Sequence, residues 1–252
     1  MKIKFIIPLF FLGWLTVGSL DAQTFGNGAP GLRIDVSGAN EDGDVGLAIQ
    51  LVVAMTILTL GPSVIMMMTC FTRIIIVLGF VRNAIGVNAA PSSQIIIGLA
   101  LFLTFFIMGP VWNNIYEDAV TPYIEQKMKS SQALEVATAY MKDFMMNQTR
   151  QEDAQFFLEI SRQGAMTRDQ LPLSIVVPSF ILSELRTAFQ MGFLIFIPFI
   201  VVDFIVASSL MSMGMMMMPP VVISMPFKLL LFVLVDGWYL IIQSLVESFN
   251  LS

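Results

Sequence analysis

Residues 173–210 read LSIVVPSFILSELRTAFQMGFLIFIPFIVVDFIVASSL, and this apolar stretch decides the fold. As one α-helix, its 38 residues would be about 57 Å long, nearly twice the thickness of the hydrocarbon core of a bilayer. Pro178 and Pro198 lie inside it, and each removes a helical hydrogen bond. We therefore expect a membrane-embedded helix that kinks, tilts or leaves the bilayer.

The rest of the chain has the composition of a membrane protein. Hydrophobic residues make up 56% of the 252 residues and charged residues only 12%, against about 25% in a typical soluble domain. Residues 45–72 and 83–116 carry no charge, and each run exceeds the roughly 20 residues that a membrane-spanning helix needs. The sequence therefore predicts an all-α membrane protein with about four kinked membrane-embedded helical segments, and it excludes a soluble protein.

Glycine and proline pairs indicate where these embedded segments break. Gly61-Pro62 is expected to divide residues 45–81 into two helical pieces, because proline disrupts the helical turn before it. Gly109-Pro110 is expected to end a second span over residues 94–112. A last embedded region is predicted over residues 221–249.

Residues 113–171 differ from the embedded segments in composition. They hold six of the 13 Lys and Arg residues and nine of the 18 Asp and Glu residues. Thr121-Pro122 favours a helix start with proline at the first helical position, and Thr149 with Glu152 has the spacing of a capping box. We expect a small helical domain outside the bilayer.

The first 22 residues have the pattern of a signal peptide, with Lys2 and Lys4 before an apolar core and Ala22 at a plausible cleavage position. An uncleaved membrane anchor is the alternative. An exported N-terminus and four spans would place the polar domain in the periplasm. The predicted organisation is a signal peptide (1–22), a flexible exported arm (23–44), a first helical hairpin (45–112), a periplasmic helical domain (113–171) and a second helical hairpin (172–252) with a methionine-rich loop (211–220).

Five charged residues lie within apolar sequence, where each would cost about 2.5–3.5 kcal/mol at the centre of a bilayer. They are Glu184, Arg186, Asp203, Lys228 and Asp236. Arg73 and Arg82 can reach the membrane surface from helix ends, but the short side chain of Asp203 cannot. We therefore expect the five buried charges to lie at contacts with other subunits or to line water.

The positions of these charges predict their neighbours. Asp203 lies 11 residues before Gly214 and Lys228 lies 14 after it, so an antiparallel hairpin would bring them within about one helical turn of the same depth. We expect them to pair within or between subunits. Glu184 and Arg186 are two residues apart, so they point to nearly opposite faces of a helix and should meet different neighbours.

Several function classes are excluded by what the chain lacks. It has no histidine and one cysteine, Cys70, so a zinc site of Cys and His cannot form. We expect no catalytic, cofactor-binding or metal-binding residues, since there is no nucleophile–base set and no Gly-rich phosphate loop. The net charge of −5 argues against a nucleic-acid partner. A methionine-lined small-solute or metal-ion transporter stays open, because thioethers bind Cu(I).

Long motifs resemble the FliP family, a membrane component of the bacterial flagellar type III protein export gate. Residues 178–193 (PSFILSELRTAFQMGF) and 198–208 (PFIVVDFIVAS) are similar to its two signatures, and 213–220 (MGMMMMPP) with Pro226-Phe-Lys228-Leu continues the match. Upstream, Phe71-Thr-Arg73, residues 82–86 and residues 91–94 also fit. The resemblance covers essentially residues 45–249, and related subunits serve injectisomes.

This resemblance implies a role and a set of partners. FliP-like subunits form a five-membered ring with FliQ-like and FliR-like partners in the inner membrane at the flagellar basal body, and unfolded flagellar proteins pass through it. A flexible apolar collar suits such a pore, since it contacts many different segments and blocks ions by dewetting when empty. The family's gasket corresponds here to Met211, Met213, Met215, Met216, Met217 and Met218.

Overall fold

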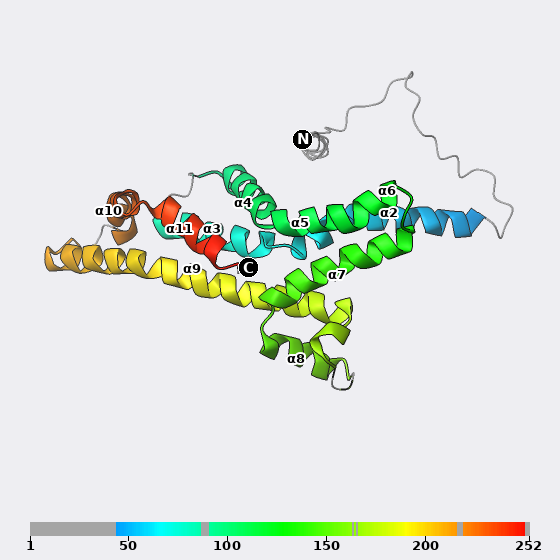
Figure 1. Ribbon diagram of the computed structural model, residues 1–252. Helices are drawn as coiled ribbons and strands as arrows, with labels where there is room; N and C mark the ends of the chain where they lie inside the picture. Colours follow the sequence, from blue (N-terminus) through cyan, green and yellow to red (C-terminus); the bar gives the residue numbers. More distant parts are fainter. Residues whose placement is uncertain (1–43, 87–90, 163, 165, 216–218, 250–252) are drawn as a thin grey trace, which may run out of the picture. The chain divides into compact units, whose positions relative to one another are not determined.

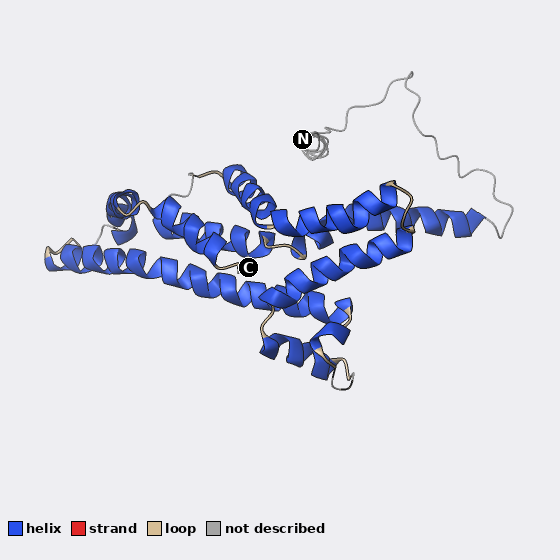
Figure 2. Cartoon of the chain, viewed as in Figure 1, coloured by secondary structure: helices blue, strands red, loops and turns tan. Residues whose placement is uncertain are grey.

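The computed structural model describes residues 44–86, 91–162, 164, 166–215 and 219–249. Within these residues all regular secondary structure is helical (Figure 2). The predicted signal peptide and nearly all of the exported arm lie outside the described residues. The chain divides into two units, residues 1–53 and 54–252, and the packing discussed below lies within the second unit.

The helices follow one another with short connections (Figure 1). Their bounds are α2 Asp44–Met67, α3 Phe71–Ile85, α4 Ser93–Ile107, α5 Gly109–Ile115, the π-helical η2 Tyr116–Val120, α6 Thr121–Ile124, α7 Ser130–Gln148, α8 Gln151–Ile160, the 3-10 helical η3 Arg168–Gln170, α9 Leu173–Ser212, α10 Pro220–Leu234 and α11 Gly237–Glu247.

The predicted break at Gly61-Pro62 is wrong, because α2 continues through both residues to Met67. The chain breaks instead just before α3, where the Thr69 hydroxyl donates to the Met66 carbonyl at 2.7 Å and accepts from the backbone N–H of Phe71 at 3.3 Å. Such side-chain bonds compete with helical ones. The helix therefore tolerates the hydrogen bond lost at Pro62, and it ends where the Thr69 side chain bonds to the backbone.

The other predicted boundaries fare differently. The break at Gly109-Pro110 is confirmed, since α4 ends at Ile107 and the next helices turn from it by 55°. The helix expected from Thr121-Pro122 is only the four-residue α6, which directly continues η2. The capping box is wrong: Arg150 is the N-cap of α8, while the Thr149 hydroxyl donates back to the Met145 carbonyl at 2.7 Å.

Among the described residues, two helices are long and apolar enough to cross a membrane: Ile49–Met67 within α2 and Leu173–Ser212, which is all of α9. Up to four spans result if each bent pair, α4 with the helices after it and α10 with α11, is one span. The last region, expected as one segment, is bent by 62° between α10 and α11. Asp236 occupies this bend in the left-handed conformation, with φ 50°.

The core forms where α3 lies along α9, and α7, α8 and α10 also pack against α9. On α3 the fully buried side chains recur at helical spacing, which defines one face of that helix. They include Ile74, Val77, Leu78 and Val81. Val176, Phe180 and Ala188 of α9 belong to the same cluster. One face of the first half of α9 is therefore covered by protein of its own chain.

A close approach of α3 to α9 occurs at Gly192, where the Phe80 ring covers the glycine. A Cβ atom added there would lie 2.4 Å from Cδ2 of Phe80, and the ring also packs edge-on against Phe189 and Phe196. The ring cannot move away without losing these contacts. The close packing of α3 against α9 therefore requires a glycine, with no Cβ atom, at position 192.

We expect Gly192→Ala to destabilise the chain by about 1–3 kcal/mol, the usual cost of overpacking. Thermal unfolding of the purified chain in detergent measures this. Gly61→Ala is the matched control, because a Cβ atom there meets nothing within 4 Å. Adding Phe80→Leu to Gly192→Ala should recover part of the loss; a Gly192→Ala chain as stable as the parent would contradict the packing argument.

Candidate functional site: buried charges and a methionine turn

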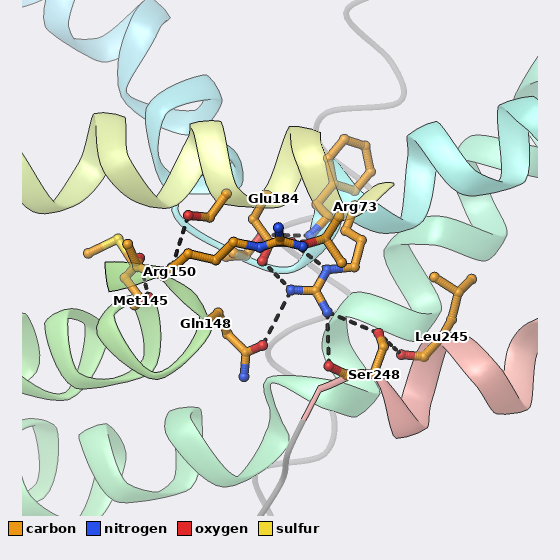
Figure 3. A network of polar contacts seen from close by, with 12 residues as sticks. Arg73, Met145, Gln148, Arg150, Glu184, Leu245 and Ser248 are labelled. Carbon is orange, nitrogen blue, oxygen red and sulfur yellow. Dashed lines mark hydrogen bonds and ion pairs between the residues drawn. The ribbon is translucent and has the colours of Figure 1, made fainter. Parts of the chain in front are cut away.

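Glu184 is fully buried on α9 and bound by Arg73 of α3 (Figure 3). Nε of Arg73 donates to Oε2 of Glu184 at 2.8 Å, and Nη2 donates to Oε1. Both side chains are almost without solvent contact. The expectation that Arg73 reaches the membrane surface is therefore wrong; it neutralises a carboxylate inside the chain.

Arg186 lies on a different face of α9 and meets α8, as the two-residue offset from Glu184 predicted. Its guanidinium lies 3.1 Å from Oδ1 of Asp153 and 3.3 Å from Oε2 of Glu152. Asp153 is buried, and its other carboxylate oxygen accepts from the Ser183 hydroxyl at 2.6 Å. These polar contacts hold the first turn of α8 against α9.

A third polar contact involves the middle of α7. Here Tyr140 donates to the Asp118 carboxylate of η2, and this hydrogen bond raises the pKa of the Tyr140 hydroxyl above its ordinary value. A separate shallow pocket is lined by Ala139, Lys142, Asp143, Met146 and Arg168. The described residues contain no group of three or more His, Cys, Asp or Glu side chains that could hold a metal ion.

Asp203 and Lys228 form an ion pair between α9 and α10 within one chain. Nζ of Lys228 lies 2.6 Å from Oδ2 of Asp203, and the Ser224 hydroxyl donates to Oδ1. Lys228 is buried and Asp203 is half-buried. The pairing predicted from hairpin geometry is confirmed within the chain.

Asp236 differs from the other four charges. It is exposed at the bend between α10 and α11, and its backbone accepts the N–H of Leu240 at 3.2 Å. The other four have partners within the chain, so partner subunits are not needed to neutralise them. That these charges also lie at subunit contacts stays a prediction.

Sequence reasoning missed several polar residues of this site, among them Asp153, Ser183 and Ser224. Ser183 and Ser224 each stand one helical turn or less from a charge on their own or the facing helix. A buried hydroxyl beside a buried carboxylate is the signal that could have identified them, since buried polar groups need partners.

The methionine turn, residues 211–215, lies at the end of α9. Its geometry explains why the helix ends there. Gly214 adopts φ 73°, its N–H donates to the Met211 carbonyl, and the N–H of Met215 donates to the Leu210 carbonyl, both at 3.0 Å. This left-handed glycine closes the helix. Met211, Met213 and Met215 are 59%, 72% and 45% exposed. Met216, Met217 and Met218 lie outside the described residues.

The second half of α9 presents large apolar side chains that the chain itself leaves exposed. They are Phe193, Leu194, Ile197, Ile200, Val201, Phe204 and Ile205. An exposed apolar surface of this extent is typical of contact with lipid or with another protein. It ends at Ile205, and the exposed Ser208 and Ser209 lie between it and Met211.

Comparison with known proteins places the chain in a family. It matches the family model described as the FliP family over residues 54–245. It is 48% identical over 217 residues to the flagellar biosynthetic protein FliP of Bacillus subtilis (strain 168), covering 86% of this chain and 98% of that protein. The corresponding proteins of Pectobacterium carotovorum and Aquifex aeolicus are 47% and 45% identical, covering 81% and 83% of this chain and 79% and 89% of theirs. These matches confirm the resemblance carried by the sequence motifs.

Proposed function

Because the chain belongs to the FliP family, we propose that it is a core pore-forming subunit of the flagellar type III export gate. In this role it passes unfolded flagellar proteins across the bacterial inner membrane at the flagellar basal body. It is a structural membrane subunit and not an enzyme. The flagellar name of the relatives favours this branch over the injectisome branch.

The observation that carries the proposal is the methionine turn at the end of α9. Three methionines stand exposed there, on a turn fixed by Gly214 and beside a helix pair that is held by the Asp203–Lys228 ion pair. Methionine side chains are flexible and polarizable. A rigid support with a deformable apolar edge suits a constriction that must close against ions and still admit varied polypeptides.

The assembly part of the proposal is a ring of five copies with FliQ-like and FliR-like subunits, in contact with other export apparatus proteins and with lipid. Support comes from the exposed apolar surface of α9, which a single chain does not cover. In the ring, Glu184, Arg186, Asp203, Lys228 and Asp236 would lie near subunit contacts. Residues 113–171 would face the periplasm.

We expect replacement of Met211, Met213 and Met215 by alanine to increase ion leak through the assembled gate, because three flexible side chains no longer fill the constriction. Conductance of the purified complex in planar bilayers measures the leak, and we expect a rise of severalfold with assembly preserved. The control replaces Met55 and Met67, two exposed methionines of α2, by alanine. Equal conductance in all three proteins would count against the gasket.

A swimming assay tests the wider role. A strain lacking this protein should lose motility and regain it when the intact chain is supplied. The other candidate, a small-solute or metal-ion transporter, is not favoured by family membership. Tight Cu(I) binding by the purified chain without partner proteins, together with normal swimming of the deletion strain, would favour the transporter instead.

A further inference from the structure

We propose that the turn after α11, Ser248–Phe249, is a lid over the buried Arg73–Glu184 ion pair and couples α11 to the α3–α9 core. The position of α11 then depends on the charge of Arg73, which is buried in the core of the protein. Figure 3 shows Arg73 between Glu184, Gln148 and Ser248. This inference concerns the coupling of helices and does not depend on the proposed pore.

The Arg73 guanidinium uses all of its hydrogen-bond donors inside the protein. A guanidinium has five N–H donors in a fixed plane, and here all five have acceptors. Nε and Nη2 serve Glu184, Nη2 also donates to Oε1 of Gln148 at 3.3 Å, and Nη1 donates to the carbonyl and the hydroxyl of Ser248, both at 3.0 Å. Without Ser248, Nη1 would be left without a partner inside the protein.

Ser248 is the C-cap residue of α11. The last carbonyls of a helix have no intrahelical donor, and the C-terminal end carries partial negative charge. The Ser248 carbonyl is one of these groups, and it points at a buried cation. The Ser248 hydroxyl donates to the Leu245 carbonyl at 2.7 Å, which leaves its oxygen free to accept from Arg73.

Phe249 covers the guanidinium of Arg73. The ring of Phe249 lies on it, with Cζ of Arg73 3.8 Å from the ring centroid. Phe249 is 1% exposed, and Leu245 of the same turn is fully buried. The ring therefore adds a cation–π contact and excludes water from the ion pair. Moving α11 away would expose the Arg73 guanidinium to water.

Amide hydrogen exchange of the full-length chain in detergent tests this coupling. Arg73→Lys keeps the charge but offers three donors without the planar fork. We expect exchange in the last turn of α11 to accelerate about tenfold or more, as the loss of charge-assisted hydrogen bonds predicts. The control is Arg82→Lys on the same helix, whose guanidinium donates to Ser93 at 2.9 Å; it should leave α11 unchanged.

The reciprocal variant removes the two side chains of the lid and keeps the ion pair, while the Ser248 carbonyl stays as an acceptor for Nη1. Ser248→Ala with Phe249→Ala should accelerate exchange around Arg73 in α3 and around Glu184 in α9, again by about tenfold. This second variant also serves if Arg73→Lys cannot be recovered folded. Unchanged exchange around the ion pair in the lid variant would overturn the proposal, as would unchanged α11 exchange in a folded Arg73→Lys chain.

Discussion

Replacing Glu184 by alanine is expected to remove a large part of the stability of the folded chain. The change leaves the Arg73 guanidinium buried without its counter-ion, and breaking one half of a buried ion pair costs about 3–5 kcal/mol. A whole domain has only about 5–15 kcal/mol. The folded fraction in membranes and the midpoint of thermal unfolding in detergent should both fall sharply, with loss of any export function.

The controls separate the buried charge from a general effect of mutating α9. Glu152→Ala removes a partner of Arg186 whose own side chain is 82% exposed, that of Glu152. This change should alter the free energy of unfolding by less than about 1 kcal/mol. Arg73→Met with Glu184→Leu replaces both charges by apolar groups and should be more stable than Glu184→Ala alone. If the double variant is no better than the single one, the uncompensated charge is not the cause.

The sequence predicted those features that depend on local periodicity and register. The length and apolar character of residues 173–210 gave the long helix α9, Gly109-Pro110 gave a real break, and counting from Gly214 brought Asp203 and Lys228 together. In each case the deciding residues are close in sequence, or are joined by a short turn that fixes their relation.

The sequence failed where tertiary contacts decide. Arg73 and Glu184 are separated by 111 residues, and no local pattern shows that they share a buried site. For this reason the sequence did not predict that Glu184 and Arg186 have counter-ions within the chain, while the subunit contacts expected for the five charges stay a prediction. The predictions of a helix break at Pro62 and of a capping box at Thr149 failed for a related reason. Thr69 and Arg150 make hydrogen bonds that helix propensities do not take into account.

Lys228→Asp is expected to prevent stable folding of the α9–α10 pair. The substitution places a second carboxylate beside Asp203 at a buried position and removes the cation that lies 2.6 Å from it. Like charges at such a distance repel, and the low dielectric of an apolar surrounding strengthens the repulsion. We expect a loss of several kcal/mol, measured as the amount of assembled complex in native gels and as swimming of the complemented strain.

The reversed pair, Asp203→Lys with Lys228→Asp, restores opposite charges and should recover a substantial part of the assembly lost in Lys228→Asp. Recovery should be incomplete, because Ser224 donates to the native carboxylate and would face an ammonium group in the reversed pair. The matched control reverses Glu125 and Lys127, an exposed pair at 2.6 Å, and should change assembly little. The coupling energy from the double-mutant cycle decides the matter: a value near zero would mean that the two charges do not stabilise one another, and their contact would then lose its role in holding the support of the methionine turn.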